Sequence, residues 1–225
     1  MCGRFTLFES KESLSGIFGV QASPWPGARY NIAPSRPVAA VRIAPEDPGR
    51  REWTLLRWGL VPPWAKDPAI GNRMINARAE TVAQKPAFRS AWKSRRCLIP
   101  ANGFYEWQRR NGRKQPWYVR MRGGKPFAIA GLWERWEPPS GEPIESCALI
   151  TTVPNDLLAP IHGRMPAILP PAEYDRWLSA PPGEAHSLLA LLRPFPAREM
   201  EAWEVGLWVN RPENDSPDLI APLRG

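Results

Sequence analysis

Residues 103–122 read Gly-Phe-Tyr-Glu-Trp-Gln-Arg-Arg-Asn-Gly-Arg-Lys-Gln-Pro-Trp-Tyr-Val-Arg-Met-Arg. Two runs rich in apolar and aromatic residues, 103–109 and 116–122, stand on either side of Asn111-Gly112. Asn-Gly favours the type I′ turn, because both central positions of that turn need a positive φ. The stretch therefore predicts a β-hairpin, the unit from which an antiparallel sheet is built.

Further short runs surround this hairpin, with β-branched or aromatic residues inside and Pro or Gly at their borders. Such runs favour strands, and they lie at 2–8, 37–44, 52–58, 126–133, 145–152 and 203–209. Helical patterns lie at 9–18, 80–92, 171–180 and 184–193. Strands in the middle with helices at the flanks predict a single α+β domain over residues 1–225, built on a largely antiparallel sheet.

Four tryptophans in strand-like runs are expected in the core of this domain. They are Trp53, Trp133, Trp203 and Trp208. The C-terminal tail is expected to be an ordered extended segment, because three apolar side chains give it something to bury. These are Leu219, Ile220 and Leu223.

The composition points to a globular protein with an excess of positive charge. The 225 residues are 43% apolar, which excludes disorder along the whole chain, and 30 Lys and Arg against 22 Asp and Glu give a formal net charge of +8. Cations together with twelve tryptophans are typical of nucleic-acid-binding proteins. A GC-rich genome would produce the same bias, so composition leaves both interpretations open.

Several classes of protein do not fit the sequence. No apolar run approaches the roughly 20 residues of a membrane span, and the first residues lack the pattern of a signal peptide. We therefore expect a cytoplasmic protein with no membrane association. Three cysteines without a Cys-x-x-Cys or Cys/His cluster predict neither a metal site nor a cofactor. Cys97 and Cys147 stand in apolar runs and are expected to be buried structural thiols.

Cys2 follows Met1 directly, and because cysteine is small we expect Met1 to be removed, by an aminopeptidase or by the protein itself. Cys2 would then carry an α-amine with a pKa of about 8 beside a thiol with a pKa of about 8.5. An aldehyde suits this pair, since the amine forms a Schiff base and the thiol closes a thiazolidine ring. The alternative is a cysteine at position 2 by chance, on a frayed terminus.

Three further polar residues stand in settings that suit acid–base or binding chemistry. His162 lies in a loop bordered by Gly and Pro and is a candidate acid or base near neutral pH, or else a structural residue. Glu106 lies between two large aromatic residues, which would raise its pKa unless it faces solvent. Asn76 precedes a predicted helix, where Asn is most often an N-cap, although its amide could also hold a polar substrate.

These residues belong to motifs that are specific as a set. In chain order the motifs are Met1-Cys2-Gly3-Arg4, Tyr30-Asn31-Ile32-Ala33-Pro34, Arg57-Trp58-Gly59-Leu60-Val61-Pro62, Ile75-Asn76-Ala77-Arg78-Ala79-Glu80-Thr81, Arg96-Cys97-Leu98-Ile99-Pro100, Gly103-Phe104-Tyr105-Glu106-Trp107 and His162-Gly163-Arg164-Met165-Pro166. The set resembles the SRAP family, named for SOS response-associated peptidases and also called abasic site processing proteins. The resemblance covers essentially the whole chain.

The resemblance implies an α+β fold with a barrel-like core, and a DNA-damage protein that acts on abasic sites in single-stranded DNA. It implies a covalent crosslink through Cys2, together with autopeptidase and lyase-type activity. By motif, Asn76 would position the Cys2 amine or the sugar, Glu106 and His162 would transfer protons, and Thr151 would be an accessory polar group. The protein would be a monomer that needs no cofactor and associates with the nucleoid when it binds DNA.

The resemblance also implies a DNA-binding surface. Arg4, Arg78 and Arg164 would bind the phosphates beside the lesion, and we expect their charges to favour the Cys2 thiolate. Stacking or wedge surfaces would come from Pro34, Trp64 and Trp107. Two alternatives remain open: a thiol peptidase that pairs Cys2 with His162 and acts on itself or on other proteins, and a non-catalytic binder of single-stranded nucleic acid.

Overall fold

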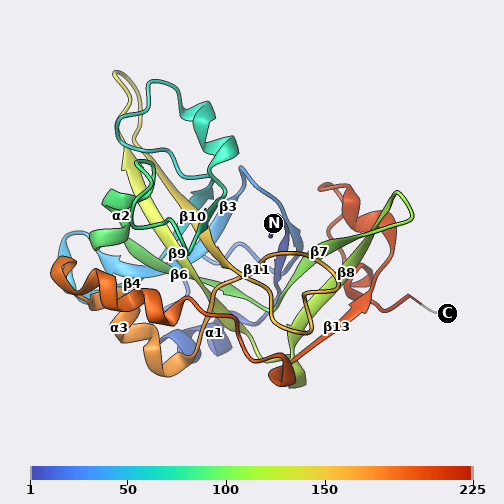
Figure 1. Ribbon diagram of the computed structural model, residues 1–225. Helices are drawn as coiled ribbons and strands as arrows, with labels where there is room; N and C mark the ends of the chain where they lie inside the picture. Colours follow the sequence, from blue (N-terminus) through green and yellow to red (C-terminus); the bar gives the residue numbers. More distant parts are fainter. Residues whose placement is uncertain (1, 224–225) are drawn as a thin grey trace.

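The computed structural model describes residues 2–223 (Figure 1). Its strands are β1 (Phe5–Leu7), β2 (Arg29–Ile32), β3 (Pro37–Ala44), β4 (Asp47–Trp58), β5 (Asn76–Arg78), β6 (Arg96–Ala101), β7 (Gly103–Arg110), β8 (Arg113–Met121), β9 (Phe127–Trp136), β10 (Ile144–Thr152), β11 (Met165–Pro166), β12 (Ile168–Leu169) and β13 (Met200–Glu204). The α-helices are α1 (Lys11–Phe18), α2 (Arg89–Ser94) and α3 (Tyr174–Ser179). Short 3-10 helices include η1 (Pro68–Arg73), η4 (Pro182–Leu191) and η6 (Leu207–Asn210).

The predicted hairpin is confirmed as β7 and β8, and it lies in a five-stranded sheet of order β13-β8-β7-β1-β2. Asn111 and Gly112 have φ values of 50° and 73°, as the type I′ turn requires. The first residue of β7, Gly103, must be a glycine, because a Cβ there would lie 2.3 Å from Tyr118 Oη on β8. The glycine thus lets the Tyr118 ring cover the start of β7 and reach Thr6 Oγ1 on β1, 2.9 Å from Tyr118 Oη.

The second sheet closes into a small barrel. β10 pairs with β4, β4 with β3, β3 with β6, β6 with β9, and β9 again with β10. The β10–β4 and β10–β5 pairings are parallel and the others in this sheet are antiparallel. Closure leaves the ring without an open edge. The expected α+β fold with a largely antiparallel, barrel-like core is therefore confirmed.

The two sheets share one hydrophobic core, which makes the fold a single domain. The cluster of buried residues runs from Cys2, Phe5 and Phe104 near the five-stranded sheet to Leu98 and Ile129 of the barrel. The rings of Phe5 on β1 and Trp58 on β4 meet edge to face at 5.2 Å, a packing that aromatic pairs favour. The chain after Cys2 is thereby held between the sheets.

The helix predicted at 80–92 is wrong in most of its length. Residues 79–84 form turns, and α2 begins only at Arg89. Pro86 explains the difference, because proline disfavours the helical conformation of the residue before it and cannot donate within a helix. The other predicted helices are present as α1, α3 and η4, the last with 3-10 geometry.

The strand predicted at 203–209 is also wrong in its second half. β13 ends at Glu204, and Val205 N–H donates to the Pro116 carbonyl of β8. Since Pro116 has no N–H to return, the ladder stops there and the chain turns into η6. Trp208 is consequently 76% exposed and not a core residue, and Leu223 is also exposed. Trp53, Trp133 and Leu219 are buried as predicted, whereas Trp203 and Ile220 are partly buried.

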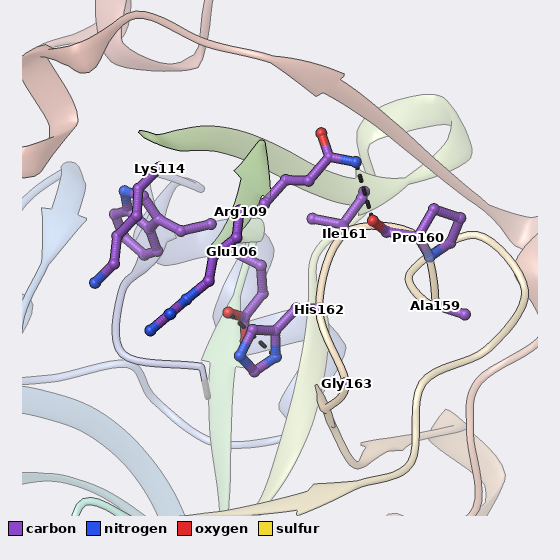
Figure 2. A pocket seen from close by; sticks show the side chains of 10 residues that line it. Glu106, Arg109, Lys114, Ala159, Pro160, Ile161, His162 and Gly163 are labelled. Carbon is purple, nitrogen blue, oxygen red and sulfur yellow. Dashed lines mark hydrogen bonds and ion pairs between the residues drawn. The ribbon is translucent and has the colours of Figure 1, made fainter. Parts of the chain in front are cut away.

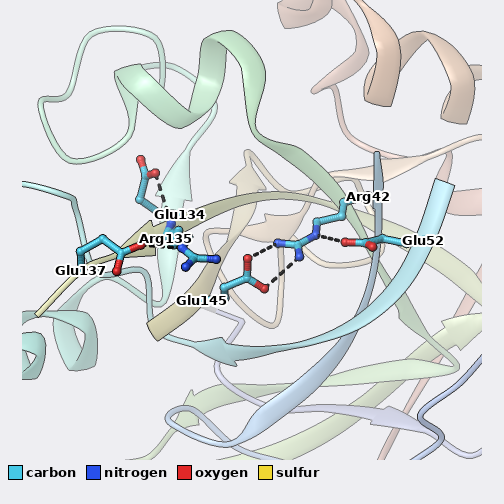
Figure 3. Close-up of polar contacts among 6 residues, drawn as sticks. All are labelled: Arg42, Glu52, Glu134, Arg135, Glu137 and Glu145. Atoms are coloured by element: carbon cyan, nitrogen blue, oxygen red, sulfur yellow. Dashed lines mark hydrogen bonds and ion pairs between the residues drawn. The ribbon is translucent and has the colours of Figure 1, made fainter. Parts of the chain in front are cut away.

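A buried charge network crosses the barrel (Figure 3). Arg42 on β3 donates to Glu52 on β4 at 2.7 Å and, through two nitrogens, to Glu145 on β10 at 2.9 Å. Its guanidinium lies 4.1 Å from the centre of the Trp133 ring on β9. One side chain thus connects four strands of the ring.

Arg42→Met is expected to lower the free energy of unfolding by about 3–5 kcal/mol, because it leaves two carboxylates without their cation. Arg135→Met is the matched control, since Arg135 is exposed and its ion pair among residues 2–223 is with the exposed Glu137, so stability should stay essentially unchanged. Urea unfolding followed by tryptophan fluorescence measures both. Equal midpoints for the two variants would contradict the assigned role of Arg42.

In the part of the chain that the structure describes, the helices are too short and too polar to cross a bilayer.

Candidate active site

Cys2 is buried at the junction of the two sheets. Its side chain is 0% exposed, and Asn76 Nδ2 donates to its carbonyl oxygen at 2.9 Å. Asn76 begins β5, which pairs in parallel with β10 through Leu149 and Ile150. Asn76 is therefore a strand residue and not the predicted N-cap, and its amide is fixed by the barrel. Its Oδ1 atom is buried and accepts no hydrogen bond from the residues that the structure describes.

Glu106 and His162 face each other beside this cysteine. Glu106, on β7, is 1% exposed, and its Oε2 lies 3.6 Å from His162 Nδ1 (Figure 2). β7 pairs with β1, and Tyr105 N–H donates to the Arg4 carbonyl at 2.9 Å, so the strand that carries Glu106 runs beside the start of the chain. The Arg164 backbone N–H lies 3.1 Å from His162 Nδ1 and donates to it. His162 Nδ1 also lies 3.2 Å from the Arg164 carbonyl oxygen, so it accepts from the N–H in one tautomer and donates to the carbonyl in the other.

Burial changes the pKa values of this group in different directions. It raises the pKa of Glu106 to about 7 and lowers that of His162. It also raises the pKa of the Cys2 thiol, and the neighbouring Glu106 carboxylate adds to that effect. Our expectation that nearby arginines favour a Cys2 thiolate is therefore wrong, because desolvation dominates in this buried position. Glu106, with a pKa near neutrality, can act as either acid or base.

Thr151 and Arg164 form the barrel side of the site. Thr151 on β10 is buried, and its carbonyl accepts from Arg164 Nη2 at 2.6 Å. Arg164 also forms a two-pronged ion pair with Glu80 at 2.7 and 3.0 Å, which lowers the pKa of Glu80. Arg78 ends β5, pairs with Thr151 in the ladder and is exposed. Asn76, Thr151, Arg78 and Arg164 thus lie on three adjacent strands or their ends.

Arg4 connects the site to the C-terminal segment. Its Nη1 donates to Asn31 Oδ1 at 2.6 Å and to the Val209 carbonyl at 2.7 Å. Its guanidinium also lies 5.8 Å from the centre of the Trp107 ring, whose Nε1 donates to Asn210 Oδ1 at 2.7 Å. Arg4 and Trp107 therefore hold a wall of the site in place.

Pro34 and Trp64 form a separate group. Pro34 lies in the turn between β2 and β3, and Trp64 lies in the loop 59–73, with 57% of its surface exposed. Ser35 Oγ lies 2.9 Å from Asn72 Oδ1, which joins that turn to the same loop. Trp64 is thus an exposed aromatic residue on this loop. This hydrogen bond joins the turn that carries Pro34 to the loop that carries Trp64, so these two residues form a group apart from Cys2.

An open cleft of about 500 Å³ leads to the Glu106–His162 pair (Figure 2). Besides these two residues it is lined by Trp107, Gln108, Arg109, Lys114 and the segment 159–163. Gln108 Nε2 donates to the Pro160 carbonyl at 2.9 Å and so joins β7 to the loop of His162. Sequence reasoning missed Arg109 and Lys114. The available signal was their position on either side of Asn111-Gly112, which makes them cross-strand partners.

Cys97 and Cys147 are buried within the barrel strands β6 and β10, as predicted, and neither forms a disulfide. Among residues 2–223, no three His, Cys, Asp or Glu side chains gather in a way that could hold a metal ion.

The fold and the site define a class: α+β proteins in which a cysteine next to the start of the chain is buried beside a glutamate–histidine pair, between a small barrel and an antiparallel sheet. The chain belongs to the SOS response associated peptidase (SRAP) family, whose family model matches residues 1–212. The curated relatives bear the common description "abasic site processing protein".

Relatives and solved structures match over most of the chain. YoqW from Bacillus subtilis is 43% identical over 98% of this chain and 99% of its own length, and YedK from Escherichia coli is 28% identical over 99% and 100%. HMCES from Gallus gallus is 33% identical over 75% of this chain and 56% of its own. A crystal structure of a Bacteroides thetaiotaomicron protein matches with a TM-score of 0.87 at 25% identity, covering 99% of this chain and 100% of its own.

Proposed function

We propose that this protein captures abasic sites in single-stranded DNA and holds them as a thiazolidine crosslink on Cys2, after Met1 has been removed. The burial of Cys2 beside Asn76 and the Glu106–His162 pair is the observation that carries the proposal. The relatives YoqW and HMCES are both named abasic site processing proteins, which supports it. In this role the protein would shield the lesion during the response to DNA damage.

The chemistry follows from the ring-opened sugar of an abasic site, which is an aldehyde. The Cys2 amine attacks the aldehyde carbon, and the resulting carbinolamine loses water to give a Schiff base. The Cys2 sulfur then adds to the same carbon, and its proton ends on the ring nitrogen. One water molecule leaves in total, and the carbon becomes bonded to both nitrogen and sulfur. No cofactor or metal is needed for this condensation.

Glu106 and His162 supply the proton transfers that these steps require. The buried thiol of Cys2 needs a base before it can add, and Glu106 is close enough for its charge to affect the thiol pKa. With a pKa of about 7, Glu106 can also return the proton to the departing hydroxyl. We assign His162, which opens onto the cleft, to proton transfer at the sugar ring oxygen. Thr151 is assigned an accessory role through Arg164.

Removal of Met1 is assigned to the same group. Hydrolysis of the bond between Met1 and Cys2 consumes one water and frees the Cys2 amine. Asn76 already holds the Cys2 carbonyl, and Glu106 is the nearby base. This reaction explains the word peptidase in the family description without digestion of other proteins. Reversal of the crosslink, or strand cleavage from the Schiff base, would use the same acid and base.

The DNA strand is assigned to the cleft and the exposed residues around it. Arg78 is exposed at the end of β5 and offers its guanidinium to a phosphate beside the lesion. Arg4 and Arg164 contribute positive charge while their hydrogen bonds hold the walls of the site. Trp107 lines the cleft, and Pro34 and Trp64 present a stacking or wedge surface for the bases beyond it. We propose that the protein acts as a monomer in the cytoplasm or on the nucleoid.

The test uses two single-stranded oligonucleotides that differ only in one abasic site. After incubation with the purified protein, a denaturing gel should show a shifted band with the abasic strand alone. Binding of both strands without a covalent band would instead support a non-catalytic binder of nucleic acid. Turnover of added peptides would favour the general peptidase.

Asn76→Ala is expected to slow crosslinking by about 10- to 100-fold, because a mispositioned nucleophile loses part of the advantage of orientation. Thermal stability should fall only slightly, since one hydrogen bond contributes about 1 kcal/mol. Single-turnover gel assays measure the rate. An unchanged rate would show that the contact between Asn76 and the Cys2 carbonyl is only structural.

A further inference from the structure

The tip of the β7–β8 hairpin carries four cations, Arg109, Arg110, Arg113 and Lys114, here called the basic hairpin tip. All four residues are exposed. The strand register places Arg110 opposite Arg113, and Arg109 opposite Lys114. Like charges directly opposite one another destabilise a strand pair. The Asn111-Gly112 turn already specifies the hairpin, so these charges are not needed to form it.

The basic hairpin tip is poorly neutralised by the protein itself. Arg110 Nη1 lies 3.6 Å from Glu204 Oε1, and its side chain is still 70% exposed. The ion pairs among the described residues include none with Arg109, Arg113 or Lys114. The tip therefore presents three positive charges that repel one another and have no partner among these ion pairs. A polyanion bound along the hairpin would relieve this repulsion.

The basic hairpin tip is continuous with the cleft. Arg109 and Lys114 line it together with Glu106 and His162, and Figure 2 shows both cations on the same side of the Glu106–His162 pair. Arg110 and Arg113 line a second hollow, of about 420 Å³, with Gln115 and Glu204. From Glu106 to Arg110 the strand rises by about 13 Å, a length that spans a few nucleotides. The two cross-strand pairs of cations thus lie at successive positions along the hairpin beyond the reactive group, on alternate faces of the strands.

We propose that the basic hairpin tip binds the backbone phosphates of single-stranded DNA on one side of the abasic site, so that the strand leaves the cleft along β7 and β8. This inference rests on the proposed function. A site without a base offers nothing to read, so affinity must come from phosphates and shape. Arginine suits that role, because its planar guanidinium binds two phosphate oxygens at once.

The test removes three charges without changing the turn, in the variant Arg109→Gln/Arg113→Gln/Lys114→Gln. Binding of abasic single-stranded DNA is measured as a function of salt in a Cys2→Ala background, so that no stable crosslink adds to the measured affinity. The magnitude of the slope of log K against log salt should fall by about 2, because each of the three lost phosphate contacts contributes about 0.7. The matched control is Arg50→Gln/Arg135→Gln/Arg198→Gln, which removes the same charge from exposed arginines elsewhere, and its slope should decrease by far less.

Two short oligonucleotides locate the path, one with the abasic site near its 5′ end and one with it near its 3′ end. The triple variant should lose affinity about tenfold or more for one of them and little for the other. Equal losses for both, or a slope that changes no more than in the control, would overturn the assigned path.

The same variant with Cys2 intact separates this inference from the proposed function. At subsaturating DNA, its crosslinking rate should fall in step with its loss of non-covalent affinity, while the control triple variant should crosslink like the wild type. If the wild type forms no crosslink, the proposed function fails, while the salt slope still decides whether the hairpin binds DNA. Acidic peptides in place of DNA should leave the two triple variants indistinguishable. A difference between them would contradict the assigned partner.

Discussion

Cys2→Ala is expected to abolish the covalent product with abasic single-stranded DNA completely. The variant retains an α-amine at position 2 but has no sulfur to close the ring, so any Schiff base it forms stays open to hydrolysis. Non-covalent affinity should change by less than a few-fold, because the Cys2 side chain is buried and contributes no exposed surface. A denaturing gel beside a binding titration measures both quantities.

Two matched variants show whether the sulfur itself is responsible. Cys2→Ser keeps the size of the side chain, and it should give a product that borohydride traps as a reduced Schiff base but that hydrolyses otherwise. Cys97→Ala removes an equally buried thiol from β6 and should crosslink at the wild-type rate. A stable band with Cys2→Ala, or a loss with Cys97→Ala, would move the reaction away from Cys2.

Glu106→Gln is expected to slow crosslinking by about 10²- to 10⁴-fold, the usual contribution of general acid–base catalysis. Glutamine has nearly the size of glutamate but cannot exchange a proton. Removal of Met1 should slow as well, since we assign it to the same base. Removal of Met1 is measured by intact mass, after expression in a host that does not itself remove Met1. Wild-type rates of both reactions would exclude Glu106 from proton transfer.

The same substitution should change how stability depends on pH. In the folded protein Glu106 keeps its proton up to a pH of about 7, whereas its ordinary pKa is 4.5. Between these values the unfolded chain releases a proton that the folded chain retains, so the free energy of unfolding falls as pH rises. Glu106→Gln removes this loss. The free energy of unfolding of the variant, relative to that of the wild type, should therefore rise by about 3 kcal/mol from pH 4 to pH 8.

Urea unfolding at these two pH values measures that difference. Subtracting the wild type from the variant removes the contribution of His162, whose lowered pKa acts in the opposite direction. A difference that does not change with pH would contradict the raised pKa of Glu106. The expected result is a variant that is more stable and less active, a trade-off common to residues kept for catalysis.

Local signals in the sequence were sufficient for much of the fold. The Asn111-Gly112 turn predicts the pairing of β7 and β8, because a strand pair with a two-residue turn is a local structure, and the apolar runs predict β9 and β10. The closure of the barrel could not be predicted in this way. It depends on pairings between distant segments, and β5, β11 and β12 have only two or three residues each, too few for a periodic pattern.

The errors have similar causes. Pro86 interrupts the helix expected at 80–92, and Pro116 on β8 ends the pairing of β13. The apolar patterns continue past both points, so periodicity overestimated the helix at 80–92 and the strand at 203–209. Trp208 then lies on η6, outside the ladder, and is largely exposed. Backbone donors, and not hydrophobicity, decided these boundaries.

The candidate site was predictable as a set of motifs but not as a geometry. Cys2, Asn76, Glu106 and His162 come from four separate segments, and only the resemblance placed them together. The ion pair between Arg164 and Glu80, and the burial that keeps Cys2 a neutral thiol, depend on the packing of the two sheets. The arginines in the motifs led to the opposite expectation for the thiol, because a motif contains no information about desolvation.

The mass of the covalent product tests the central proposal most directly. The wild-type protein is incubated with a defined single-stranded oligonucleotide that contains one abasic site, and the product is measured intact and after proteolysis. We expect the mass of the chain without Met1 plus that of the oligonucleotide minus one water, with the modification confined to the peptide that begins at Cys2. A product that retains Met1, or one attached at a lysine or at Cys97 or Cys147, would contradict the proposal.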